Sequence, residues 1–290
     1  MSAIRNAARV LRGVTRSPAG LFAVCVLVLI CLIAIVSFVW LPQDPNAAHA
    51  SRLWLPPSAE HWLGTDGSGR DIASRLIAGS RVSLGVALGT GLLATVIGFA
   101  LALPGGLGSK PVREIIAVSI DVLVAFPTIL LAIMLTAVFG SGIPIVIISL
   151  GVAFGVSIGR VLRAELRQVS GADFVLAARV AGLSKSRILV RHLIPSVRPV
   201  FVVQLTLSMG TAVLAEASLS YLGFGAPKSI PSWGVMLSET QRYISIYPET
   251  VLWPGLAITL IVLAFFLFGD ALRDALDMRE PADETAEVTI

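Results

Sequence analysis

Six long apolar runs, separated by polar stretches, dominate the chain and predict six membrane-spanning helices. The runs cover Leu21–Leu41, Val82–Leu103, Ile115–Phe139, Ile143–Ile158, Val200–Leu222 and Val251–Gly269. An apolar helix of about 20 residues crosses the hydrocarbon core of a bilayer. Pro127 in the third run predicts a kink, which neighbouring helices tolerate in a membrane. The second run carries Gly85, Gly89, Gly91 and Gly98, which favour close helix packing.

Basic residues lie mostly in the segments that these runs place on one side of the membrane. Six spans put both termini on the same side. Sixteen of the 22 basic residues fall in the N-terminal segment, at 110–113, in the loop 160–198 or after the last run. The positive-inside rule therefore predicts that both termini and the loop 160–198 are cytoplasmic.

The basic N-terminus and first apolar run also match a secretory signal peptide, with Ala48–Ala50 as a small-x-small cleavage pattern. The run is 21 residues long, whereas a signal core has about 7–15. We expect an uncleaved first span.

Composition agrees with a membrane protein. The chain is 56% hydrophobic and 14% charged, with a mean hydropathy of +0.87, whereas soluble domains carry about 25% charged residues. The pI near 9.5 does not indicate nucleic-acid binding, because the basic residues sit in short loops and form no single basic face.

The sequence carries no recognisable nucleotide or metal site. A Walker A loop requires Gly-Lys-Ser/Thr, and no lysine in the chain follows a glycine. His49, His61 and His192 are scattered, and no His-Glu-x-x-His motif is present. Cys25 and Cys31 lie on different faces of one apolar run, which disfavours a disulfide or metal pair. An intramembrane hydrolase is therefore disfavoured.

A charged segment, residues 173–195, lies between the fourth and fifth runs and is too polar for a bilayer. Val175, Leu176, Val180 and Leu183 recur at helical spacing and predict an amphipathic helix.

Small and special residues in this segment predict a docking surface. Ala177 and Ala178 allow another protein to approach the backbone closely. Gly182 is placed to end the helix in the left-handed conformation. Pro195 suits the first turn of the next membrane helix.

Ala177-Ala178, Gly182 and Ile194-Pro195 resemble the "EAA" coupling loop of ABC importer permeases. Leu176 replaces the usual leading glutamate and His192 replaces a common isoleucine, as in the second (C-type) permease subunit of the dipeptide/oligopeptide/nickel branch.

The segment HWLGTDGSGRDIASRLIAGSRVSL, residues 61–84, resembles the part that precedes the core of these permeases. The resemblance covers roughly residues 50–280 and suggests an external role for this segment. Residue by residue, its glycines and aspartates predict only a tight turn.

The resemblance implies an all-α integral membrane protein with a five-helix, MetI-like permease core and one added N-terminal helix. It divides the chain into residues 1–80 (N-terminus, first helix and external loop), residues 81–280 (core, with the coupling loop 160–198) and an acidic tail, residues 281–290.

The same resemblance implies the transmembrane subunit of an ATP-driven, binding-protein-dependent importer of di- or oligopeptides or a related small solute. This chain would be no enzyme and hold no cofactor, since ATP and Mg²⁺ would bind two separate ATPase subunits. A homologous permease and an external binding protein would complete the complex. Ala177, Ala178, Gly182 and Pro195 would dock the ATPase, with charge contacts from Arg179 and Arg191.

Asp121 and Glu216 are acids within apolar sequence, where an ionisable group is costly and is a functional hypothesis by default. Both lie in segments that resemble the family. Helix packing or a salt bridge is the first interpretation for each. Lining the path is the other, and Glu216 is also a candidate for gating or for contact with the partner permease.

A stand-alone secondary transporter or channel is the alternative function. Such a protein would work without an ATPase, and bulky residues at Ala177 or Ala178 would leave transport intact. More intramembrane acids or histidines and an inverted repeat would be expected of it.

Overall fold

The computed structural model describes residues 12–277, and its regular elements are helices, with one isolated bridge between Thr65 and Asp71. Arg5, Arg9 and the acidic tail 281–290 lie outside the described residues. In chain order the elements are α2 (Pro18–Ser37), η1 (Ala50–Arg52), α3 (Ile72–Leu107), α4 (Lys110–Val124), α5 (Thr128–Phe139), α6 (Ile143–Ser170), α7 (Asp173–Val180), α8 (Lys185–Ile188), η2 (Leu189–Leu193), α9 (Ile194–Tyr221), α10 (Trp233–Thr240), η3 (Gln241–Tyr243) and α11 (Glu249–Asp277).

Within residues 12–277, five helices are long and apolar enough to span a membrane: α2, α3, α6, the continuous α8–η2–α9 helix and α11. The pair α4 and α5 makes a sixth span only if the two are counted together across an 81° bend. Pro127 sits at the start of α5 with an extended backbone (ψ 126°), so its missing N–H and its ring end helical continuity. The kink predicted at Pro127 is a full break between two helices.

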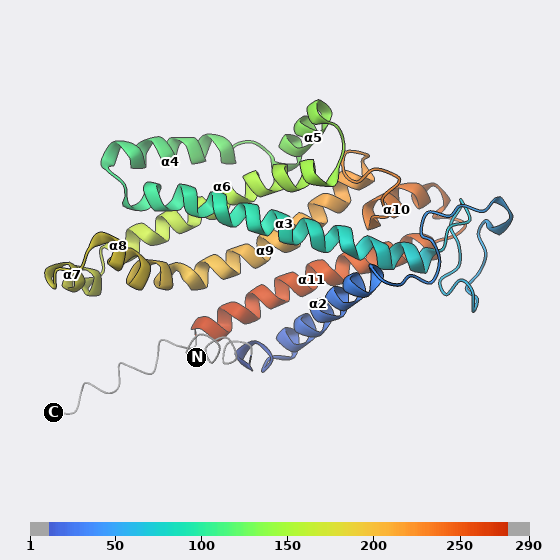
Figure 1. Ribbon diagram of the computed structural model, residues 1–290, viewed down its shortest axis with the longest axis horizontal. Helices are drawn as coiled ribbons and strands as arrows, with labels where there is room; N and C mark the ends of the chain where they lie inside the picture. The colour runs from blue at the N-terminus through green and yellow to red at the C-terminus, as the bar shows by residue number, and fades with distance from the viewer. Residues whose placement is uncertain (1–11, 278–290) are drawn as a thin grey trace.

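The centre of the bundle is the long contact between α3 and α6, which lie side by side (Figure 1). Glycines permit this approach, since a Cβ at Gly98 would lie 2.7 Å from Ile158 and one at Gly155 would lie 2.7 Å from Ile97. The predicted packing role is thus confirmed for Gly98. At Gly85 an added Cβ meets nothing within 4 Å, so this glycine packs against no described residue of this chain.

The second layer consists of α9, α11 and α2. Helix α11 packs between α9 and α2, and the three form one face of the molecule (Figure 1). Ile30, Val213, Ile261 and Phe265 join these helices in one buried cluster.

Helices α4 and α5 lie at the edge of the bundle and are largely uncovered (Figure 1). Helix α4 buries only Ile120, and α5 buries only Ala132 and Thr136. Their outer side chains, such as Ile115 and Val138, are apolar and exposed. Such a surface requires lipid or another protein chain.

Candidate functional site

Helix α7 and its following turn protrude at the end of the bundle opposite the loop that precedes α3 (Figure 1). Gly182 follows the helix with φ +78°, as the sequence predicted. Its N–H donates to the carbonyl of Arg179 at 3.0 Å, and the N–H of Leu183 donates to the carbonyl of Ala178 at 3.2 Å. This pair of bonds is a Schellman motif, which satisfies helix-end carbonyls and fixes the turn.

The inner face of α7 packs against its own chain. Val175 and Ala178 are buried and join Leu166, Ile188 and Leu193 in one hydrophobic cluster. Ala178, expected on the docking surface, is only 7% exposed and faces the bundle. The two alanines therefore differ in exposure, since Ala178 is buried and Ala177 is exposed.

The outer face of α7 is apolar. Phe174, Leu176 and Val180 are exposed, and Val180 is the most open at 89%. The residues of the predicted amphipathic stripe therefore do not share one face: Val175 is buried, whereas Leu176 and Val180 are exposed. Sequence spacing found the stripe but could not tell which of its members the rest of the chain covers.

The two arginines predicted to make charge contacts lie on α7 and η2. The Arg179 Nη2 donates to the carbonyl of Ser170 at 3.4 Å, which connects α7 to the end of α6. Arg179 also lines a cavity of about 660 Å³ together with Leu107, Leu183 and Lys185. Arg191 is exposed on the π-helical turn η2.

Pro195 lies in the first turn of α9, as predicted, although α9 continues from the preceding helix without an N-terminal cap. Helices α8, η2 and α9 run on continuously from Lys185, and Pro195 follows the π turn. Since Pro195 has no N–H to donate to Arg191, the turn before it widens. The N–H of Ile194 donates instead to the carbonyl of Leu189, five residues back.

Asp121 lies on α4 opposite Arg160 of α6, with Oδ1 and Nη2 4.0 Å apart. Both side chains are more than half exposed. The pair is therefore loose and open to the surroundings of the chain. The geometry brings Asp121 to a basic residue of a neighbouring helix, as the first interpretation expects.

Glu216, by contrast, is fully buried within α9. Ser220 donates to its Oε1 at 2.6 Å and accepts from the N–H of Ala226 at 2.8 Å. Glu216 Oε2 has no hydrogen-bond partner among the described residues. The hydrogen-bonded residues Glu216 and Ser220 connect α9 to the loop before α10. Glu216 lines no open surface in this conformation.

A second cluster, which the sequence did not reveal, lies at the end of the bundle opposite α7. Asp66 accepts from Arg70 at 2.9 Å and from Arg75 at 2.5 Å, and Glu239 accepts from the same two arginines at 2.7 and 2.8 Å. Arg75 is 1% exposed although charged. The cluster connects the loop before α3 to α10, two segments more than 160 residues apart.

Aromatic rings reinforce this connection. Trp54 stacks on Tyr247 with ring centroids 4.2 Å apart, and it lies edge-on to Tyr243 at 4.8 Å. Trp54 has φ +53°, a costly conformation for a bulky residue that neighbouring contacts hold in place.

No group of three metal-ligating side chains comes together within residues 12–277. Cys25 and Cys31 are both free and exposed.

Long apolar helices that carry an amphipathic helix on a loop beyond the spans define an α-helical membrane protein. The chain belongs to the family of binding-protein-dependent transport system inner membrane components, whose sequence profile matches residues 94–280. It is thus a multi-pass permease subunit of this kind of transport system.

Relatives share most of their length with the chain. The nickel transport system permease protein NikC of Escherichia coli K12 is 39% identical over 255 residues, covering 88% of this chain and 92% of NikC. The dipeptide permease DppC of Alkalihalophilus pseudofirmus is 38% identical, covering 87% and 85%. The glutathione permease GsiD of Pectobacterium atrosepticum is 38% identical, covering 93% and 88%.

The fold also resembles a chain of the methionine ABC transporter MetNI in an inward-facing conformation. The TM-score is 0.59, and the match covers 70% of this chain and 96% of that chain at 18% identity. The likeness confirms the expected MetI-like, all-α core.

Proposed function

We propose that this permease subunit carries di- or oligopeptides, or a related small solute such as a metal chelate, across the membrane in an ATP-driven importer. The outer face of α7 carries the proposal. It presents exposed apolar side chains, a Schellman turn ends the helix, and a buried cluster holds the helix to the bundle. Relatives named for nickel, dipeptides and glutathione support the solute class.

The distribution of basic residues supports an orientation with α7 and both termini in the cytoplasm. Separate ATPase subunits, two per complex, would meet α7 there and hold ATP and Mg²⁺. This chain would hold no cofactor.

Contact with the ATPase would involve Leu176, Ala177 and Val180, with Arg179 and Arg191 beside them. Behind this face, Val175 and Ala178 belong to the same buried cluster as Leu166 of α6 and Leu193 of η2. When α7 moves with the ATPase, these contacts would carry the movement into α6 and α9. The membrane helices would thereby alternate between outward-facing and inward-facing forms.

Two further partners fit the remaining surfaces. A homologous permease would cover the apolar outer faces of α4 and α5, with lipid on the rest of the bundle. An external substrate-binding protein would dock at the end formed by the loop before α3 and α10. Nucleic acid has no part in this function.

Purification of the tagged chain from its native membrane in mild detergent tests the proposal. We expect two ATPase subunits and one homologous permease in stoichiometric amounts. A chain that purifies alone, and that conducts solute in vesicles without ATP, would establish the stand-alone transporter or channel instead.

A further inference from the structure

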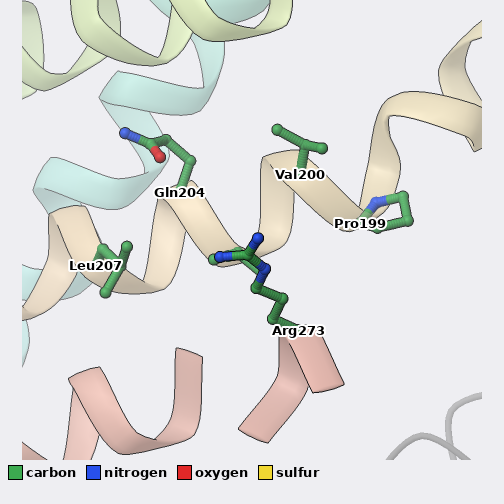
Figure 2. A pocket seen from close by; sticks show the side chains of 6 residues that line it. Pro199, Val200, Gln204, Leu207 and Arg273 are labelled. Carbon is green, nitrogen blue, oxygen red and sulfur yellow. The ribbon is translucent and has the colours of Figure 1, made fainter. Parts of the chain in front are cut away.

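A cavity of about 350 Å³ lies between α9 and α11. Gln204 of α9 and Arg273 of α11 are the polar side chains among its lining residues. Figure 2 shows Gln204 pointing away from Arg273. This cavity therefore offers no convergent site to a polar ligand.

A polar cavity of about 320 Å³ opens at the other end of the bundle, opposite α7 and beside α10 (Figure 1). Three segments that are distant in sequence line it. The loop before α3 contributes Asp66 and Arg70, and the loop before α10 contributes Lys228. Glu239 comes from α10 and Arg242 from η3. Charged side chains thus converge on this cavity.

The acids of the cavity are held by a fixed set of ion pairs. Asp66 is 3% exposed and accepts from Arg70 and from the buried Arg75. Glu239 accepts from the same two arginines. Each carboxylate therefore already has two arginines as counter-charges, and the pairs fix the inner wall of the cavity.

Two further cations, Lys228 and Arg242, line the cavity with exposed side chains. Neither side chain has an ion pair or a hydrogen bond with another residue of the described range 12–277. Four basic groups, including Arg70 and Arg75, thus surround two carboxylates, which leaves an excess of two positive charges. A cleft with an excess of one sign of charge attracts groups of the opposite sign.

The available donors suit a carboxylate carried on a protein surface. An ammonium and a guanidinium both make charge-assisted hydrogen bonds to carboxylate oxygens. Apolar side chains next to the two cations in sequence are exposed as well, namely Ile230, Ile244 and Ile246. Exposed apolar residues beside charged ones are typical of a protein docking surface rather than of a site for a small anion.

We propose that the external substrate-binding protein inserts one side-chain carboxylate into this cavity, between Lys228 and Arg242. The family's transport systems depend on a binding protein. The inference rests on the proposed function, which places that protein at this end of the bundle. Lys228 and Arg242 make the contact, and the ion pairs of Asp66 and Glu239 hold the cavity in shape behind them.

Carbodiimide cross-linking of the purified importer, with its purified binding protein bound, tests the contact. The reagent joins a carboxylate to an amine that it touches. Lys228 is the only lysine of the chain at this end, since Lys110 and Lys185 begin α4 and α8. We expect a cross-link between Lys228 and an aspartate or glutamate of the binding protein. Lys228→Arg is the matched control, because it keeps the charge and removes the amine: binding persists and the cross-link is lost.

The affinity of the importer in nanodiscs for the binding protein measures each charge. We expect Lys228→Gln and Arg242→Gln each to weaken binding about fivefold at low salt, with a smaller difference at high salt. Arg52→Gln is the control, since it removes a positive charge from the same end that does not line the cavity. It should bind as the wild type does.

Wild-type affinity in both Lys228→Gln and Arg242→Gln overturns the proposal. So does a cross-link from Lys228 to the partner permease, or none at all in a complex that contains the binding protein. Co-purification of the ATPase subunits is scored separately. Failure of the docking contact leaves that co-purification intact, whereas failure of the proposed function abolishes it.

Discussion

The backbone N–H of Leu183 donates a hydrogen bond of 3.2 Å to the carbonyl of Ala178. The bond spans the turn at Gly182, and both side chains pack in the cluster that joins α7 to α3, α6 and α9. Helix α7 therefore cannot shift without displacing its contacts in the bundle. We propose that these buried contacts let a surface helix move membrane helices.

Gly182→Val should uncouple transport. The added Cβ meets no atom within 4 Å, so the cost is backbone strain, roughly 1–3 kcal/mol for a β-branched residue at φ +78°. We expect ATP-driven uptake in proteoliposomes to fall about tenfold while the chain still inserts. Gly182→Asn is the control, because asparagine tolerates this conformation. Equal uptake by Gly182→Val and wild type would show that the turn has no role in coupling.

Val180→Asp should release the ATPase without harming the fold, because Val180 is 89% exposed in the isolated chain. Val175→Asp is the contrasting variant, since it places a carboxylate in the buried cluster. Co-purification and thermal unfolding in detergent separate the two effects. We expect Val180→Asp to lose ATPase subunits at unchanged unfolding temperature and Val175→Asp to lower that temperature. Full ATPase retention by Val180→Asp would rule out the outer face of α7 as the docking surface.

Ser220→Ala should loosen the loop before α10. The change leaves Glu216 and the N–H of Ala226 without their shared partner, which costs about 1–3 kcal/mol when both are buried. Ser218→Ala is the control, since its exposed hydroxyl bonds only to the carbonyl of Leu214 in its own helix. Thermal unfolding should show a clear drop for Ser220→Ala alone. Matching unfolding temperatures for the two variants would contradict the assigned bonds.

Arg75→Gln should strongly destabilise the end of the bundle opposite α7. It leaves Asp66 buried with one arginine fewer, and breaking a buried ion pair costs about 3–5 kcal/mol. Arg52→Gln, which breaks an exposed pair with Glu60, should cost about 0–1 kcal/mol. The free energy of unfolding in mixed micelles measures both. Similar small losses would mean that the buried cluster does not hold the loop to α10.

The sequence predicted those features that depend on residues close together in the chain. The apolar runs gave the membrane helices, and Gly182 gave the end of α7. The features that the sequence did not predict depend on contacts between residues far apart in the chain. Ala178 is buried in a cluster whose other members, such as Leu166 and Ile188, lie elsewhere in the chain. The pairing of Arg75 with Glu239 joins residues separated by 164 positions, and no spacing rule connects them.

The two prolines show the same limit. Pro127 and Pro195 both lack an N–H, yet one ends a helix and the other only widens a turn. Pro127 lies between two helices at the edge of the bundle. Pro195 lies in a helix whose neighbours, Leu193 and Val197, are buried. Buried neighbours on both sides of Pro195 keep its helix continuous. The sequence pattern does not show which residues will be buried in this way.

Cross-linking from α7 in the assembled complex tests the central claim most directly. Cys25 and Cys31 are first replaced by serine, because both are exposed. A photoreactive maleimide is then attached to Ala177→Cys, which points outward, or to Ala178→Cys, which is 7% exposed. We predict an adduct with an ATPase subunit from Ala177→Cys that depends on light and is absent from Ala178→Cys. Adducts with lipid alone, or none with any ATPase, would contradict the account.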